Sequence, residues 1–532
     1  MIRKRTVRGV SRMRGVAAGL TAACVVLAAC GSSTKSSSTA TSASTAAAAN
    51  TAAVTTAGAG TAAAGTAAGG TTAATMTAGT TAGTPAAGAT DDVIPVAGNN
   101  PNGYGQDAGN PKLYKGAGGF QLDTSKCPSD WNPTGGITDK TIKLFSALPL
   151  SGPIAAIGAY GEGMKSYFQY INAHGGIDGR NVDLTVNDNQ YKPDLTKTIA
   201  DAALADGSYM GSVGINGTPM NLAIWDEMNQ ECVPMLLTGS GAAQWGDVKG
   251  HPWTGPGLTF TYIAESRIQA EWLKQKFPNG AKIVTITINN DFGKQYLSGL
   301  KAAVKGTNLT IVGSELHDPA APNLDNEFTS AAATNADVLV LESSGTPCTQ
   351  VLASLERSSW KPTFILPNSC QGTAIFKPLI AQGLTGKGAY VVQTSIAPND
   401  PSVKTDPFVA AYYSFLPTIG LDPNNTQYAA GWQFAWAATE ILKVASTYKG
   451  GLNRANVILA HRAMDQTLPL LLPGLSFKSN GTTDAYLFEG GQMAQYYVTD
   501  PANPGTFKKA GDLINFEGQL GTFDNFAAAI GG

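Results

Sequence analysis

The alternation of strand-like and helix-like stretches from residue 141 onward is the feature that most constrains the fold. Short runs rich in Val, Ile, Leu and Thr are separated by amphipathic stretches of helical length. Strands that alternate with helices predict parallel sheets covered by helices on both faces. The pattern pauses in a Gly- and Pro-rich segment at 244–262 and then resumes. We therefore expect an α/β protein with two lobes of the same design.

The expected elements can be placed by residue number. Strands are expected at 141–150, 181–186, 209–215 and 233–239 in the first lobe, and at 281–289, 309–316, 337–345, 362–368 and 389–395 in the second. Helices are expected at 160–171, 193–206, 219–231, 293–306, 324–335 and 349–359, and again at 406–416, 426–446 and 453–464. Short strands at 475–479, 484–491 and 493–500 end the pattern. An ending in strands after three helices suggests that the chain crosses back between the lobes.

The first 29 residues have the pattern of an export signal. A basic start is followed by an apolar run at 16–29 that is too short for a permanent membrane span. The run ends in Leu27, Ala28, Ala29 and Cys30, which resembles the box of bacterial lipoprotein precursors. The resemblance implies cleavage before Cys30 and attachment of a lipid to Cys30. The alternative is an ordinary signal peptide with a chance cysteine.

Residues 30–90 consist almost entirely of Thr, Ala, Ser and Gly after Cys30. Such a segment buries too little apolar surface to offset the entropy of ordering, so we expect a disordered tether. As a flexible coil of that length it would reach roughly 40 to 45 Å. The tether would join a lipid in the bilayer to a globular part.

Charge and hydropathy exclude some classes of partner. Of the 36 Lys and Arg residues, six lie before residue 15, so the remaining 30 face 38 Asp and Glu residues. A mildly acidic chain without a basic block argues against nucleic acid as a partner. No second stretch approaches 18 uninterrupted apolar residues, so we expect the globular part to stay outside the membrane.

Four cysteines follow the tether, and an even number in an exported chain predicts two disulfides. Cys348 comes just after the strand expected at 337–345, and Cys370 just after the one at 362–368. Because neighbouring parallel strands bring their ends close together, we expect these two to pair. Cys127 and Cys232 then pair by elimination. The cysteines are too scattered for a zinc site.

Several stretches together resemble the type I periplasmic binding proteins, particularly the Leu/Ile/Val receptors. They are the strand, Ser-Gly-Pro and helix at 141–180, the loop at 233–241, the segment at 288–296 and the segment at 477–492. The resemblance covers 136–532 and implies the two-lobed fold with several hinge crossings. It also implies a receptor that passes a small molecule to the permease of an ABC transporter.

On this basis the chain divides into seven expected parts. They are the signal peptide (1–29), the tether (30–90), an N-terminal extension (91–135), the first part of lobe 1 (136–258), the first part of lobe 2 (259–392), the second part of lobe 1 (393–468), and the C-terminal strands and tail of lobe 2 (469–532). We expect a monomer anchored to the outer face of the cell membrane.

Ligands of open α/β sheets gather outside the carboxyl ends of the strands. The resemblance implies that two loops of lobe 1 hold the ligand, through Gly217 and Thr218 and through Gly239, Ser240 and Gly241. Phe292 stands where the family usually has a tyrosine that covers the ligand. The alternative for each residue is plain turn chemistry.

Three positions depart from the amino acid receptors. Ile157 and Ser344 replace expected tyrosines, and Asn368 replaces the glutamate that pairs with the ligand's ammonium group. An unpaired buried cation is costly, so we expect a small polar metabolite such as an amide, a carboxylate or an amino acid derivative rather than leucine, isoleucine or valine. Glu342 is the one nearby acid that could replace the missing partner.

The sequence gives little support for an enzymatic function. The four histidines fall in unrelated segments, and Ser240 lies in an incomplete nucleophile-elbow motif. We therefore expect no catalytic residues, no metal and no cofactor. Besides the importer receptor, two alternatives remain: a ligand sensor of the same fold that acts on a signalling partner, and a secreted hydrolase.

Overall fold

The computed structural model describes residues 97–152, 154–501 and 504–527. The predicted signal peptide (1–29), its lipidation site Cys30 and the predicted tether (30–90) lie outside these residues. Within the described residues, no helix combines the length and apolar character needed to cross a membrane.

The first sheet has four strands in the order β5-β4-β6-β7, all paired in parallel. Its central strand β4 (Thr141–Leu148) is almost wholly buried, in line with its apolar sequence. The neighbours are β5 (Asn181–Asp188), β6 (Gly211–Val213) and β7 (Met235–Leu236). The connecting helices are α1 (Ala155–Gly158), α2 (Tyr160–Ala173), α3 (Pro193–Asp206) and α4 (Thr218–Gln230).

The second sheet has seven strands in the order β16-β15-β12-β11-β10-β8-β9. Its parallel part comprises β8 (Ala281–Ile288), β9 (Leu309–His317), β10 (Val338–Glu342), β11 (Thr363–Ile365) and β12 (Tyr390–Gln393). Helices α5 (Tyr262–Lys276), α6 (Asp291–Val304), α7 (Asp325–Ala333), α8 (Thr346–Arg357) and α9 (Thr373–Ile380) accompany these strands. The alternation in the sequence therefore predicted the parallel α/β design of both sheets.

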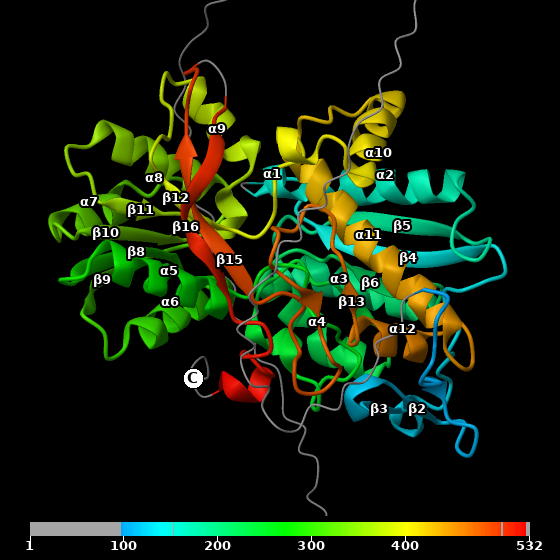
Figure 1. The fold of residues 1–532 in the computed structure, drawn as a ribbon. Helices are drawn as coiled ribbons and strands as arrows, with labels where there is room; N and C mark the ends of the chain where they lie inside the picture. Colours follow the sequence, from blue (N-terminus) through cyan, green and yellow to red (C-terminus); the bar gives the residue numbers. More distant parts are fainter. Residues whose placement is uncertain (1–96, 153, 502–503, 528–532) are drawn as a thin grey trace, which may run out of the picture. The chain divides into compact units, whose positions relative to one another are not determined.

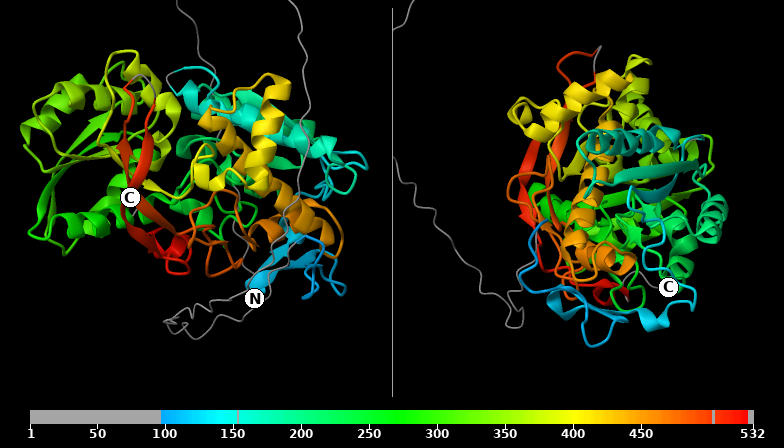
Figure 2. Two further views of the ribbon diagram at one scale, coloured as in Figure 1. Left: turned by 45° about the horizontal axis from the view of Figure 1, so that its top comes forward. Right: turned by 90° about the vertical axis from the view of Figure 1, so that its right-hand side faces the viewer.

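The chain then returns to the first sheet and crosses to the second again. Helices α10 (Pro407–Phe415), α11 (Thr426–Thr447) and α12 (Arg454–His461) follow β12, and the first part of α11 packs against α2 (Figures 1 and 2). Gly163 of α2 faces Tyr428 of α11, and a Cβ at Gly163 would collide with the Tyr428 backbone. The indole Nε1 of Trp432 donates a hydrogen bond to Ser166 Oγ over 2.8 Å. Glycine and serine thus allow the two helices to pack closely.

Two strands at the end of the chain complete the second sheet. β15 (Gly490–Tyr497) pairs antiparallel with β12, and β16 (Thr506–Asn515) pairs antiparallel with β15 (Figure 1). The expectation of a strand at 484–491 is wrong for residues 484–489, which form an irregular segment before β15. β16 was not expected, because polar residues such as Lys508, Lys509 and Asp512 conceal its strand pattern. A short antiparallel pair, β13 (Asp465–Gln466) and β14 (Phe477–Lys478), precedes these strands.

The N-terminal extension forms a small antiparallel sheet of its own, which the sequence did not predict. It consists of β1 (Gly105–Gln106), β2 (Leu113–Lys115) and β3 (Gln121–Asp123). A disulfide joins Cys127 to Cys232, just after α4, and Trp131 Nε1 donates a hydrogen bond to the Cys232 carbonyl over 2.9 Å. The extension is therefore covalently fixed to the half of the fold that contains the sheet β5-β4-β6-β7, which we call the first-sheet half.

Both expected disulfides are present, which confirms the pairing. Cys348, in α8 after β10, is bonded to Cys370, after β11, and their Cα atoms are 6.2 Å apart. β10 and β11 are parallel neighbours, as the pairing argument required.

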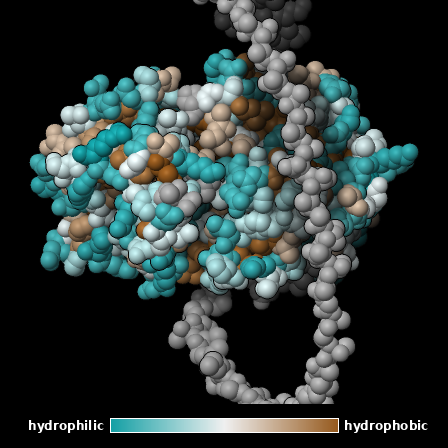
Figure 3. Space-filling view, turned by 90° about the horizontal axis from the view of Figure 1, so that it is seen from above, coloured by the Kyte–Doolittle hydropathy of each residue, from teal (hydrophilic) through white to brown (hydrophobic). Residues whose placement is uncertain are grey.

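Hydrophilic and hydrophobic residues are interspersed over the face shown in Figure 3. The large hydrophobic side chains exposed on the described part of the chain are Leu150, Val312, Leu316, Ile419 and Tyr497.

Candidate functional site

Two loops at the carboxyl ends of β6 and β7 are joined by backbone hydrogen bonds. Gly217 N donates to the Gly239 carbonyl over 3.0 Å, and Gly239 N donates to the Ile215 carbonyl over 2.8 Å. Gly217 has a φ of +95°, and a Cβ there would collide with Met220 and lie 2.8 Å from the Tyr191 ring. Only glycine fits this position without strain. The predicted residues of lobe 1 therefore do lie side by side.

Three hydroxyl groups meet where these loops converge. Thr218 Oγ1 lies 2.7 Å from Ser240 Oγ and 3.2 Å from Tyr262 Oη, and Tyr262 Oη lies 3.3 Å from Ser240 Oγ. Thr218, Ser240 and Tyr262 are buried. We call these three residues the hydroxyl cluster. Thr218 and Ser240 were predicted from the sequence, whereas Tyr262 was not.

Tyr262 begins α5, the first helix of the half that contains the seven-stranded sheet, which we call the second-sheet half. Its backbone N–H donates to the Gly241 carbonyl over 3.0 Å. Its ring stacks on Tyr296 at a centroid distance of 4.4 Å and meets the edge of Phe292 at 5.0 Å. Phe292 is buried in this aromatic group. The structure thus places Phe292 beside the predicted loops, with Tyr262 between them.

A buried carboxyl group continues this network into the second-sheet half. Glu265, one helical turn after Tyr262, accepts hydrogen bonds from Tyr296 Oη at 2.5 Å and from the backbone N–H of Asn368 at 2.7 Å. Burial raises the pKa of Glu265 to about 7, although these hydrogen bonds act to lower it. The Asn368 side chain donates to the Val392 carbonyl over 2.7 Å. Asn368 is therefore linked to the hydroxyl cluster through Glu265 and the stacked tyrosines.

A second buried carboxyl group lies at the end of β10. Glu342 Oε2 accepts a hydrogen bond from Thr287 Oγ1 over 2.6 Å, while Glu342 Oε1 has no hydrogen-bond partner among the described residues. Burial raises the pKa of Glu342 to about 8. A carboxyl group in this state is protonated for most of the neutral pH range.

The two remaining predicted positions stand apart from this network. Ser344 is buried just after β10, and Ile157 packs from α1 against the main hydrophobic core. No hydrogen bond joins Ser344 to the network in the part of the chain that the structure describes. Among the described residues, no group of three or more His, Cys, Asp and Glu side chains is arranged to hold a metal ion.

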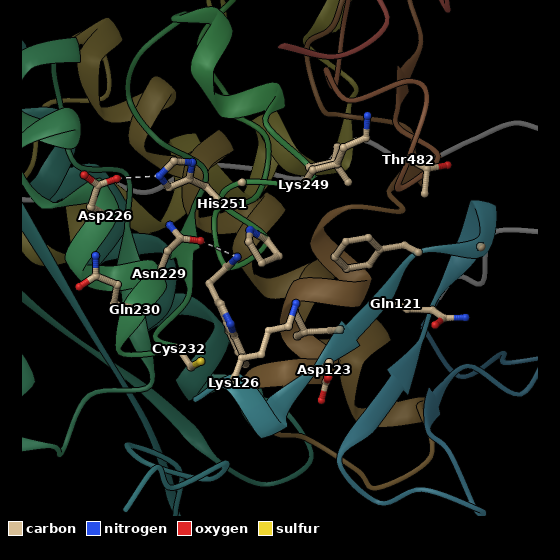
Figure 4. Close-up of a pocket in the computed structure, with 17 residues that line it drawn as sticks. Gln121, Asp123, Lys126, Asp226, Asn229, Gln230, Cys232, Lys249, His251 and Thr482 are labelled. Atoms are coloured by element: carbon tan, nitrogen blue, oxygen red, sulfur yellow. Dashed lines mark hydrogen bonds and ion pairs between the residues drawn. The ribbon is translucent and has the colours of Figure 1, made fainter. Parts of the chain in front are cut away.

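A hollow of about 670 Å³ lies elsewhere, between the N-terminal extension and α4 (Figure 4). His251 projects into it and bonds to Asp226 Oδ1 at 2.8 Å and to Asp247 Oδ2 at 2.7 Å. Of the predicted site residues only Cys232 lines this hollow, through its place beside the extension. The hollow and the hydroxyl cluster are therefore separate sites.

Comparison with known proteins shows to which family the chain belongs. A model of the family described as "Periplasmic binding protein" matches residues 141–492. The chain belongs to the periplasmic binding protein family. A search of curated proteins found no significant match to the chain.

Solved structures share the fold of this periplasmic binding protein. A fatty acid ABC transporter substrate-binding protein from Thermomonospora curvata is 20% identical, with a TM-score of 0.60 over 73% of this chain and 96% of that one. A branched-chain amino acid ABC transporter protein from Thermus thermophilus with bound valine is 16% identical, with a TM-score of 0.61 over 71% and 97%. LivJ from Streptococcus pneumoniae in complex with isoleucine is 17% identical, with a TM-score of 0.55 over 70% and 100%.

Sequence reasoning missed three members of the network in this periplasmic binding protein: Tyr262, Glu265 and Tyr296. Tyr262 and Glu265 lie at the start of α5, and Tyr262 is the last residue of the Gly- and Pro-rich segment. Tyr296 lies one turn after Phe292 on α6. The sequence around Glu265 gave little signal, because the apolar residues before it are followed at once by Ser266 and Arg267.

Proposed function

We propose that this chain is an extracytoplasmic solute-binding protein that captures a small polar metabolite and delivers it to an ABC importer. One observation carries the proposal: polar groups from both halves of the fold converge in one network, in which Tyr262 bonds to Ser240 and its ring stacks on Tyr296. The Tyr296 hydroxyl and the backbone N–H of Asn368 both donate hydrogen bonds to Glu265. The residues of this network come from loops and helix starts at the carboxyl ends of both sheets, where α/β folds bind ligands. Membership of the family supports the same role.

The solute class follows from the charges in this network. The first-sheet half offers neutral hydroxyls, and the second-sheet half offers Glu265 and Asn368, whose side-chain amide donates to the Val392 carbonyl. Hydrogen-bonding groups of this kind suit an amide, a carboxylate or an amino acid derivative. The sequence predicts the following residues for contact with the solute: Gly217, Thr218, Gly239, Ser240, Gly241, Phe292, Ser344, Asn368 and Ile157.

Solute binding is tested by titration calorimetry on the full-length protein in detergent. The panel contains primary amides, small carboxylates, amino acid derivatives and the free amino acids leucine, isoleucine and valine. We expect saturable binding of one panel member, unchanged solute after incubation, and weaker binding in Asn368→Ala. Gln230→Ala, in the separate hollow, is the matched control. Binding of no panel member, or chemical conversion of the solute, would refute the proposal.

Membrane attachment is the second part of the proposal. A lipid on Cys30 and a tether over 30–90 would hold the protein as a monomer at the outer face of the membrane, beside the permease. Cell fractionation tests this part: we expect Cys30→Ala to move to the soluble fraction once its signal is cleaved. A processed Cys30→Ala variant that stays in the membrane fraction would contradict it.

A further inference from the structure

We propose that Tyr262 is a built-in occupant of the polar corner formed by Thr218 and Ser240, and that it excludes solutes from binding there through an α-carboxylate. The inference rests on the proposed function and deepens it, because it limits the solute class. It concerns a residue that sequence reasoning did not select.

The hydroxyl cluster is closed on itself. Each of the three hydroxyl oxygens lies within 3.3 Å of the other two, and each hydroxyl has a single proton to donate. The three donors are therefore used within the cluster. A carboxylate brings only acceptors, so it could enter the corner only by displacing the hydroxyl of Tyr262.

The start of α4 offers few free amides for an anion. Gly217 N donates to the carbonyl of Gly239, and Pro219, in the first turn, has no N–H. Ala242 N, on the second loop, lies 3.3 Å from Ser240 Oγ and donates to it. The helix start that could attract a carboxylate has therefore lost part of its donor set.

Tyr262 is fixed in the corner by its own packing. Its N–H is bonded to Gly241, and its ring lies against Tyr296 and Phe292. A Cβ on Gly241 would lie 2.7 Å from the Tyr262 ring, so the absence of a side chain at 241 is what admits the ring. The position of Tyr262 is thus built by several residues, and no simple rotation of one side chain vacates it.

The two halves of the fold therefore have different roles in the proposed site. The Thr218 and Ser240 corner recognises a hydroxyl, which the protein supplies itself. Recognition of the solute's polar groups then falls to the second-sheet half, where Glu265 and Asn368 lie. The solute class that fits has no α-amino acid head group docked on the first-sheet loops.

The test uses L-leucine as the probe and calorimetry on the full-length protein, whichever panel member the wild type binds. Tyr262→Ala frees both hydroxyls and the volume of the ring. We expect it to bind L-leucine at least about tenfold more tightly than the wild type does. Thr218→Val in the Tyr262→Ala background removes one freed hydroxyl, and we expect the gain to disappear.

A second variant protects the test against misfolding. Tyr262→Leu keeps apolar volume in the aromatic group while freeing the same hydroxyls, and its thermal unfolding with and without L-leucine reports binding directly. We expect L-leucine to raise its unfolding temperature and to leave that of the wild type unchanged. Equal leucine binding by the wild type and both variants, or no gain in either folded variant, would overturn the inference. Failure of the proposed function is a different result, namely a wild type that binds no panel member.

Discussion

The two halves of this fold share a design but handle buried polar groups differently. Near the proposed site, the first-sheet half buries neutral hydroxyls that satisfy one another. The second-sheet half buries two carboxyl groups, Glu265 and Glu342, whose pKa values burial raises to about 7 and about 8. Neutral groups are insensitive to pH, whereas such carboxyl groups are not. A change of pH therefore acts on the second-sheet side of the proposed site and leaves the first-sheet side unchanged.

Each half also carries one disulfide, and the two differ in what they enclose. Cys127–Cys232 spans 105 residues and fixes the N-terminal extension to the first-sheet half. Cys348–Cys370 spans 22 residues and joins the ends of two adjacent strands in the second-sheet half. Chain entropy makes the longer loop the more stabilising cross-link.

The largest predicted effect comes from the longer loop. We expect Cys127→Ala/Cys232→Ala to lower the free energy of unfolding by about 5 kcal/mol, and Cys348→Ala/Cys370→Ala to lower it by about 3 kcal/mol. Urea unfolding of the two double variants and the wild type measures both values. A larger loss from the shorter loop would show that local packing, rather than loop length, decides the contribution in each half.

The second-largest predicted effect on stability concerns the buried carboxyl group of Glu342. Glu342→Gln keeps the shape of the side chain and removes its ionisation. The pKa of Glu342 is raised in the folded protein to about 8, from an ordinary value of 4.5. The stability that it contributes is therefore fully present below pH 4.5 and is lost as the pH rises towards about 8. We expect the variant to be more stable than the wild type at pH 7, on the order of 2 kcal/mol.

Urea unfolding at pH 4.5, 6, 7 and 8 measures this prediction. The difference between Glu342→Gln and the wild type should be smallest at the lowest pH and grow through the series. Glu231→Gln, at an exposed position after α4, is the matched control. A difference that stays constant across the series would mean that Glu342 does not gain a proton on folding.

Much of the fold was predictable from the sequence, and the reason lies in periodicity. The near-continuous apolar run at 141–150 predicted the strand β4, and the amphipathic stripe at 160–171 predicted the helix α2. β16 escaped prediction because an edge strand with an exposed face carries lysines and aspartate, which conceal the strand pattern. The small sheet of the extension escaped because its strands have only two or three residues each.

The candidate site was predictable only on its loop side. Thr218 and Ser240 follow strands, where the α/β design puts ligand-binding residues. Tyr262 and Glu265 lie inside a helix of another half, and their approach to these loops depends on the path of the chain after residue 241. Local patterns carry no information about such long-range contacts, so the sequence could suggest the loops but not their partners.

The smallest predicted effect concerns the charged cluster of the first-sheet half, which lies at the separate hollow. Burial lowers the pKa of His251, but hydrogen bonds to Asp247 and Asp226 outweigh it and raise the pKa above the ordinary 6.5. Because the folded pKa is raised, the stability from this group is present below pH 6.5 and is lost as the pH rises through the raised value. Asp226 is 78% exposed, so solvent screening weakens that partner.

We therefore expect His251→Gln to lower the free energy of unfolding by no more than about 1 kcal/mol at pH 5.5, with a difference that shrinks at higher pH. Urea unfolding at several pH values measures it, with His174→Gln on the exposed end of α2 as the control. The two differences have opposite signs, since His251→Gln is less stable than the wild type at low pH and Glu342→Gln is more stable than the wild type at high pH. As the pH rises, the size of the first difference shrinks and the size of the second grows. If the sizes of both differences grew with pH, the two halves would not differ in the way that their buried groups indicate.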